Sequence, residues 1–112
     1  MTQWVDVCSI DDLQPNSGVC ALVKSEQVAI FYFPNEDKIY AIGNYDPIGK
    51  ANVLSRGMVG DIKGEPVVAS PLYKQHFSLR SGQCLEQDDQ VPCYSVQLNG
   101  DRVQLAEFKK RG

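Results

Sequence analysis

The sequence is poor in metal ligands: it has one histidine, His76, and four cysteines, none of them in a C-x2-C pair. Closely spaced cysteines and histidines are the usual ligands of zinc and of iron–sulfur clusters, so this composition argues against both kinds of site. We expect the cysteines to be reduced and buried structural residues, with zinc binding or disulfide formation as the alternatives. They are Cys8, Cys20, Cys84 and Cys93.

Long apolar runs and basic clusters are also missing. The longest uncharged apolar run is AIFYF at 29–33, far below the roughly 18 residues of a membrane-spanning helix. The stretch MTQWVDVCSIDDL has no basic segment before an apolar one, so we expect no secretory signal and a cytoplasmic location. The formal net charge is −3, and the single basic cluster, KKR at 109–111, is too small to predict nucleic-acid binding.

Helical signals are scarce, whereas strand signals occur along most of the chain. The segment SIDD at 9–12 resembles a capping box, but PNSG at 15–18 would end any helix within two turns. Asn99-Gly100, between CYSVQL and RVQLA, predicts a hairpin with a two-residue type I′ turn. Runs of β-branched and aromatic residues predict six strands, at 18–23, 27–33, 38–43, 65–70, 93–98 and 102–106. The first three of these strands are predicted to form a meander.

These patterns indicate the fold class. The length of 112 residues and the 43% hydrophobic content predict a single domain, residues 1–112. Short strands with almost no helix predict an all-β protein, a small antiparallel β-sandwich or barrel. The turn-rich stretch between 43 and 65 is long for a compact domain, and such loops are usually functional or bind partners.

No catalytic motif is present. The serines near His76 are not framed by a G-x-S-x-G elbow, and the glycines do not have the spacing of a phosphate-binding loop. We therefore expect no catalytic residue in this chain.

Two proline-containing loops give the strongest functional signal, NYDPIG at 44–49 and SPLYKQHFSLRSG at 70–82. Together they resemble the cluster-binding loops of Rieske proteins, in which C-P-H and C-P-x-H-G-x-x-F-x-x-x-x-G hold a [2Fe–2S] centre. Pro47, Pro71, Phe77 and Gly82 fall where that family has proline, proline, phenylalanine and glycine. The resemblance covers most of the domain and implies a Rieske-like fold whose two loops form one exposed tip.

The four ligand positions depart from the family. Where Rieske proteins have Cys, His, Cys and His, this chain has Asp46, Ile48, Ser70 and Tyr73. Sulfide-bridged iron favours soft thiolate and imidazole ligands, and isoleucine has no lone pair. We therefore expect a degenerate tip that holds neither a cluster nor another metal. A mononuclear site made of Asp46, Tyr73 and His76 is less favoured than a hydrogen-bonded surface histidine.

Over the full chain the sequence more closely resembles the small subunits of bacterial assimilatory NAD(P)H-dependent nitrite reductases. The stretches SIDDL, GVCAL, EQVAIF, NYDP, VLSRG and VASPL carry that resemblance. It implies a subunit without cofactors in a cytoplasmic complex that reduces nitrite to ammonium. It also implies a large subunit that bears siroheme, FAD, a [4Fe–4S] cluster and the NAD(P)H site. Enzymatic activity would then belong to the complex.

The degenerate tip is a candidate docking surface for that large subunit, because exposed aromatic and aliphatic side chains often anchor interfaces. Alternatively, these side chains fold inward and fill the space that a cluster would occupy. A second function hypothesis is a free-standing Rieske-like protein-binding module that regulates another oxidoreductase, since fold does not determine function. The candidate interface residues are Tyr45, Pro47, Ile48, Leu72 and Tyr73.

Overall fold

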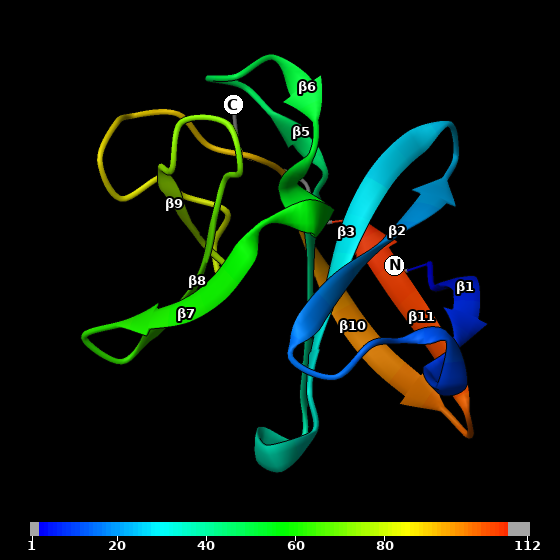
Figure 1. Cartoon of the computed structure of the whole chain (residues 1–112). Coiled ribbons are helices and arrows are strands. Elements are labelled where there is room, and N and C mark those ends of the chain that lie inside the picture. Colours follow the sequence, from blue (N-terminus) through cyan, green and yellow to red (C-terminus); the bar gives the residue numbers. More distant parts are fainter. Residues whose placement is uncertain (1–2, 108–112) are drawn as a thin grey trace.

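The computed structural model describes residues 3–107, which form antiparallel strands joined by turns and single-turn 3-10 helices (Figure 1). No α-helix occurs within this range, and the prediction of an all-β fold is confirmed. The strands are β1 (Val5–Ser9), β2 (Ser17–Val23), β3 (Glu26–Phe33), β4 (Lys38–Gly43), β5 (Tyr45–Asp46), β6 (Ala51–Asn52), β7 (Met58–Ile62), β8 (Glu65–Ala69), β9 (His76–Ser78), β10 (Cys93–Asn99) and β11 (Arg102–Glu107). The 3-10 helices are η1 (Ile10–Asp12), η2 (Pro34–Glu36) and η3 (Leu54–Arg56).

The larger sheet has six antiparallel strands in the order β1-β11-β10-β4-β3-β2. It curls until its two edge strands, β1 and β2, approach each other, so the sheet is a nearly closed barrel (Figure 1). The predicted meander of β2, β3 and β4 is confirmed by continuous antiparallel pairing. At the N-terminal side, the predicted capping box forms at Ser9, but the helix it caps, η1, is a single turn.

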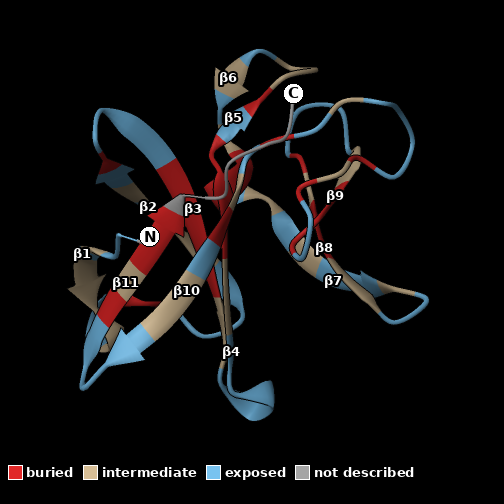
Figure 2. Ribbon diagram, turned by 180° about the vertical axis from the view of Figure 1, so that it is seen from behind, coloured by how far each residue is buried: buried red, intermediate tan, exposed pale blue. Residues whose placement is uncertain are grey.

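Two hydrophobic clusters meet at β3. Its central residues, 28–31, are all buried (Figure 2). Val28 and Ile30 point into the barrel, whereas the alternate residues Ala29 and Phe31 face a second, three-stranded sheet made of β7, β8 and β9. The cluster outside the barrel, here called the outer hydrophobic cluster, joins the barrel to the segments that carry the two loops. It consists of Ala29, Phe31, Ile42, Leu54, Val68, Phe77, Leu79, Cys84 and Val91. The loops therefore rest on a packed core.

A three-stranded sheet, β7-β8-β9, and the short pair β5–β6 lie beside the barrel. β7 occupies part of the stretch that the sequence predicts to be a turn-rich loop, so that prediction is wrong for residues 58–62. Gly60 and Asp61 lower the strand propensity of this segment, and only its pairing with β8 makes it a strand. Strands β1, β5, β6 and β9 are likewise short or irregular and lie outside the predicted set.

The C-terminal hairpin is confirmed, but its turn is displaced by one residue. Asn99 pairs with Arg102, so the two loop residues are Gly100 and Asp101 rather than Asn99 and Gly100. Gly100 has a φ of +66°, whereas neither Asn99 nor Asp101 has a positive φ. A positive φ at the first central residue alone, here a glycine, is typical of a type II′ turn. Like the type I′ turn, it matches the twist of the two strands.

No helix within residues 3–107 has the length and apolar character needed to cross a membrane.

Candidate functional site

The two loops identified in the sequence meet, and one hydrogen bond joins them. The first loop runs through the β5–β6 turn and the second connects β8 to β9, at the upper side of Figure 1. The Ser70 hydroxyl donates to Asp46 Oδ2 at 2.5 Å, and both residues are fully buried. These positions correspond to the two cysteines of the Rieske pattern, so a hydrogen bond links the loops where a cluster would.

Asp46 organises the first loop around its carboxylate. Its Oδ1 accepts from the backbone N–H groups of Ile48 at 2.8 Å and Gly49 at 3.1 Å, and its carbonyl accepts from Lys50 N at 2.6 Å. Burying a carboxylate costs free energy unless hydrogen bonds satisfy it, and charge-assisted bonds are the stronger class. The side chain is therefore committed to its own loop and to Ser70.

The second loop repeats the same turn around Ser70. The Ser70 hydroxyl oxygen accepts from Leu72 N at 3.2 Å, and the Ser70 carbonyl accepts from Lys74 N at 3.0 Å. Lys50 and Lys74 occupy the last position of each turn and have φ values of +60° and +66°. The loops are two copies of one hydrogen-bonded turn, at 46–50 and 70–74.

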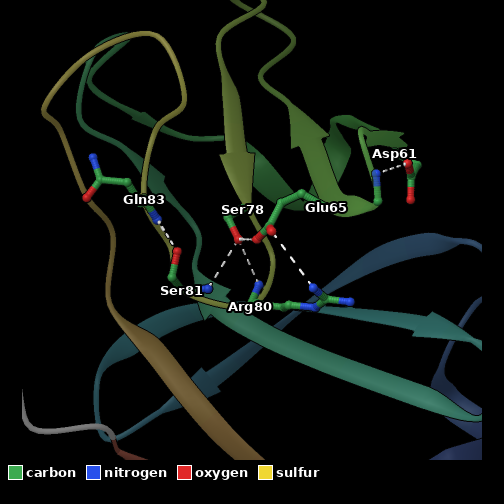
Figure 3. A network of polar contacts seen from close by, with 7 residues as sticks. Asp61, Glu65, Ser78, Arg80, Ser81 and Gln83 are labelled. Carbon is green, nitrogen blue, oxygen red and sulfur yellow. Dashed lines mark hydrogen bonds and ion pairs between the residues drawn. The ribbon is translucent and has the colours of Figure 1, made fainter.

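A third copy follows at 78–82 (Figure 3). The Ser78 hydroxyl accepts from the N–H groups of Arg80 at 3.2 Å and Ser81 at 3.3 Å, and the Ser78 carbonyl accepts from Gly82 N at 2.8 Å. The same hydroxyl donates to Glu65 Oε2, and Glu65 Oε1 lies 3.8 Å from Arg80 Nη1. This buried serine is therefore a structural residue that fixes a turn.

The residues at the four ligand positions do not fit a [2Fe–2S] cluster. The side-chain oxygens of Asp46 and Ser70 are hydrogen-bonded to each other and to backbone N–H groups. Ile48 offers only hydrocarbon and is packed against the outer hydrophobic cluster, and Tyr73 is 63% exposed. Nowhere in residues 3–107 do three or more His, Cys, Asp or Glu side chains gather closely enough to hold a metal ion.

His76 pairs with Glu86, which confirms the interpretation of this residue as a hydrogen-bonded histidine near the surface. Its Nδ1 lies 2.6 Å from Glu86 Oε2, and its backbone N–H donates to Glu86 Oε1 at 2.8 Å. The pair ties the loop after β9 to that strand.

This contact gives the fold a weak pH dependence. Desolvation raises the pKa of Glu86, but the hydrogen bonds from His76 outweigh it and hold the pKa below its ordinary value. A depressed folded pKa means that the stabilisation is complete above the unfolded pKa of about 4.3 and is lost as the pH falls through the folded value. We expect Glu86→Gln to cost at most about 1 kcal/mol at neutral pH, because the pair is exposed, and progressively less as the pH falls below the unfolded pKa. Urea unfolding of both proteins across this range is the measurement, and a difference that does not change with pH would contradict it.

The cysteines are only partly as expected. All four are free thiols, as predicted, but only Cys84 is buried. Cys8 and Cys93 are half-buried, and Cys20 is exposed, so the prediction of burial is wrong for that residue. On β2, Val19 and Ala21 pack against the hydrophobic cluster inside the barrel, so Cys20 between them points to the outer face of the sheet.

The candidate interface residues divide into two groups. Tyr45, Leu72 and Tyr73 are exposed, whereas Pro47 and Ile48 are half-buried. The structure therefore contains both situations that the sequence left open, side chains that fill the tip and side chains that project from it.

Comparison with known proteins agrees with this geometry. The model of the "Rieske-like [2Fe-2S] domain" family matches residues 3–106. The Escherichia coli K12 protein named nitrite reductase (NADH) small subunit is 47% identical over 94% of this chain and 98% of its own length. A solution structure of the nitrite reductase [NAD(P)H] small subunit from Erwinia carotovora superposes with a TM-score of 0.80 at 44% identity, covering 99% of this chain and 86% of that one.

A further relative is much longer. The Klebsiella oxytoca protein named nitrite reductase [NAD(P)H] large subunit is 41% identical over 101 residues, which are 89% of this chain and 10% of that protein. A domain of this kind is thus part of a large-subunit polypeptide in one organism and a separate small subunit in another. The chain belongs to the Rieske-like [2Fe-2S] domain family and, within it, to the nitrite reductase (NADH) small subunits.

Proposed function

We propose that this chain is the small subunit of an NADH-dependent nitrite reductase and acts by binding the large subunit of that enzyme. The match within the K. oxytoca large subunit carries the proposal, because a domain joined to a polypeptide in one organism is expected to bind the corresponding polypeptide elsewhere. The full-length match to the E. coli small subunit supports the same assignment. A free-standing regulatory module is not favoured by either relationship.

We also infer that this chain holds no redox cofactor of its own. Of the side chains at the four ligand positions, Asp46 and Ser70 are hydrogen-bonded to each other, Ile48 is apolar and Tyr73 is exposed. None of them is a thiolate or an imidazole. Siroheme, FAD, the [4Fe–4S] cluster and the NAD(P)H site, which together would reduce nitrite to ammonium, then belong to the large subunit. The complex would work in the cytoplasm.

The docking anchors that we propose are Tyr45, Leu72 and Tyr73. Large apolar side chains are costly to leave in water, and aromatic anchors that become desolvated dominate the energetics of many interfaces. Pro47 and Ile48 instead serve as filler, since Ile48 packs on the outer hydrophobic cluster.

Co-purification with the large subunit from the same genome tests the proposal. We expect the tagged wild-type chain to elute in stoichiometric amount with a large partner that shows siroheme absorbance. The variants Leu72→Asp and Tyr73→Asp should stay folded, because both residues are exposed, and should bind at least about tenfold more weakly, since each places a charge in a desolvated contact.

Leu98→Asp is the matched control. Leu98 is 45% exposed, as Leu72 is, but it lies next to the β10–β11 turn, far from the tip in Figure 1. It should bind as wild type does. Equal weakening by all three variants would rule out the tip as the docking surface, and a wild-type chain that never binds the large subunit would overturn the assigned function.

A further inference from the structure

The tip carries two lysines that form no ion pair with any other residue in the range 3–107. Lys50 and Lys74 occupy equivalent positions in the two turns 46–50 and 70–74, and both residues are exposed. Three ion pairs form among residues 3–107, and neither lysine takes part in any of them. Their ammonium groups are therefore available to a partner.

Asp46 is the one acidic residue in the turns 46–50 and 70–74. Asp46 is buried and committed to Ser70 and to its own loop. The acidic loop 85–90 lies away from the β5–β6 hairpin in both views (Figures 1 and 2), but through Glu86 it is bonded to His76, two residues after Lys74. The two turns 46–50 and 70–74 contain two lysines and one aspartate, so their formal charge is +1 in a chain whose formal net charge is −3.

The two loops present one continuous surface. Gly49 lies directly against Leu72, so closely that a Cβ at Gly49 would be 2.4 Å from Leu72 Cδ1. Leu72 is therefore in contact with the turn 46–50, and Tyr45, Tyr73 and the two lysines are exposed residues in or next to the same two loops. Apolar anchors with charged residues around them are the usual organisation of a protein–protein interface.

We propose that Lys50 and Lys74 pair with carboxylates on the large subunit, around an apolar recess that receives Leu72 and Tyr73. This inference rests on the proposed function and adds the chemistry of the partner's surface. Two lysines are too few to hold a nucleic-acid backbone, which requires several phosphate contacts, and the fused relative points to the large subunit as the occupant. Charges at the edge of an interface act mainly on the rate of association, through steering that salt screens.

The test measures association kinetics of the full chain with the full large subunit at several NaCl concentrations. We expect the wild-type association rate constant to fall about tenfold between about 0.02 M and about 0.3 M NaCl. The variant Lys50→Glu/Lys74→Glu should lower the low-salt rate constant at least about tenfold and abolish its decrease with salt. Lys50→Gln/Lys74→Gln, which only removes the charges, should give an intermediate rate and a weaker salt dependence.

The matched control is Lys24→Glu/Lys63→Glu. Lys24 and Lys63 are also exposed turn lysines with positive φ, +48° and +52°, but they lie in the β2–β3 and β7–β8 turns. This control makes the same change in net charge and should bind at close to the wild-type rate.

Three outcomes would overturn the inference. An equal loss in the control variant would show that overall charge, not the tip, controls association. If Lys50→Glu/Lys74→Glu associated at the wild-type rate while Leu72→Asp still bound more weakly, the lysines would not pair with carboxylates of the partner. The proposed function would then stand without this inference. Failure of the wild-type chain to bind the large subunit would overturn both proposals together.

Discussion

Asp46→Ala is expected to lower the free energy of unfolding by about 3 kcal/mol. The substitution removes the acceptor of the Ser70 hydroxyl and of the Ile48 and Gly49 N–H groups, in a place where water has little access. Each polar group that is left buried without a partner costs about 1–3 kcal/mol, and partial relaxation of the loop recovers some of that cost. Urea unfolding followed by circular dichroism is the measurement.

Asp61→Ala is the matched control for this prediction. Asp61 Oδ1 also accepts a backbone N–H, that of Gly64 at 2.8 Å, but it does so in the exposed β7–β8 turn. Water can replace that contact, so we expect a cost below about 1 kcal/mol. If the two alanine variants were equally stable, the hydrogen bonds of Asp46 would not hold the tip together.

A double-mutant cycle separates the link between the loops from the turn of the first loop alone. Ser70→Ala removes the hydroxyl that donates to Asp46 but leaves the backbone contacts of the carboxylate. Residues in direct contact normally show an interaction energy of about 0.5–3 kcal/mol in such a cycle. A coupling energy within that range would assign the link between the loops to this hydrogen bond.

The strands with regular patterns could be predicted from the sequence. Residues 38–43 are rich in β-branched and aromatic residues and form β4 with these bounds, and the segments 18–23 and 27–33 extend by only one residue in the structure. β7 could not be predicted in this way, because Gly60 and Asp61 interrupt its pattern of strand-forming residues. Its pairing with β8 stabilises the extended conformation instead. Local patterns therefore predicted the barrel better than the small sheet.

The link within the tip was harder to predict, because it depends on tertiary structure. Asp46 and Ser70 could be recognised as the positions of two absent cysteines, but their contact spans 24 residues and appears only when both loops are folded. A usable signal was nevertheless present. The segments DPIGK at 46–50 and SPLYK at 70–74 share a proline at the second position and a lysine at the fifth. This recurrence predicts one turn geometry used twice, and the structure shows the same turn in both segments, with positive φ at each lysine.

The exposure of individual tip residues also depended on packing. Ile48 and Tyr73 both replace histidines of the Rieske pattern, and the sequence gives no reason to treat them differently. In the fold, Ile48 reaches the outer hydrophobic cluster, whereas Tyr73 lies at the outer turn of its loop and remains exposed. One of the two positions is therefore half-buried against the core, and the other is exposed.

Gly82, which matches the last glycine of the Rieske pattern, is required both by its backbone conformation and by its packing. It ends the third turn with a φ of +79°, it is buried, and its carbonyl accepts from Val91 N at 2.9 Å. A Cβ at this position would lie 2.2 Å from the Val91 carbonyl oxygen, which is backbone and cannot rotate away. Val91 belongs to the outer hydrophobic cluster, so a shift at Gly82 would disturb the support of the tip.

We therefore expect Gly82→Ala to lower the free energy of unfolding by at least about 3 kcal/mol, from backbone strain and from the clash together. Gly64→Ala separates the two causes, because Gly64 has a similar φ of +85° but a Cβ there would meet nothing within 4 Å. The control should cost only the left-handed strain, about 1 kcal/mol. Equal destabilisation of the two variants in urea would mean that strain alone acts at Gly82. A larger loss at Gly82 would show that the glycine is required by the close approach of Val91, with no need for a cluster to explain it.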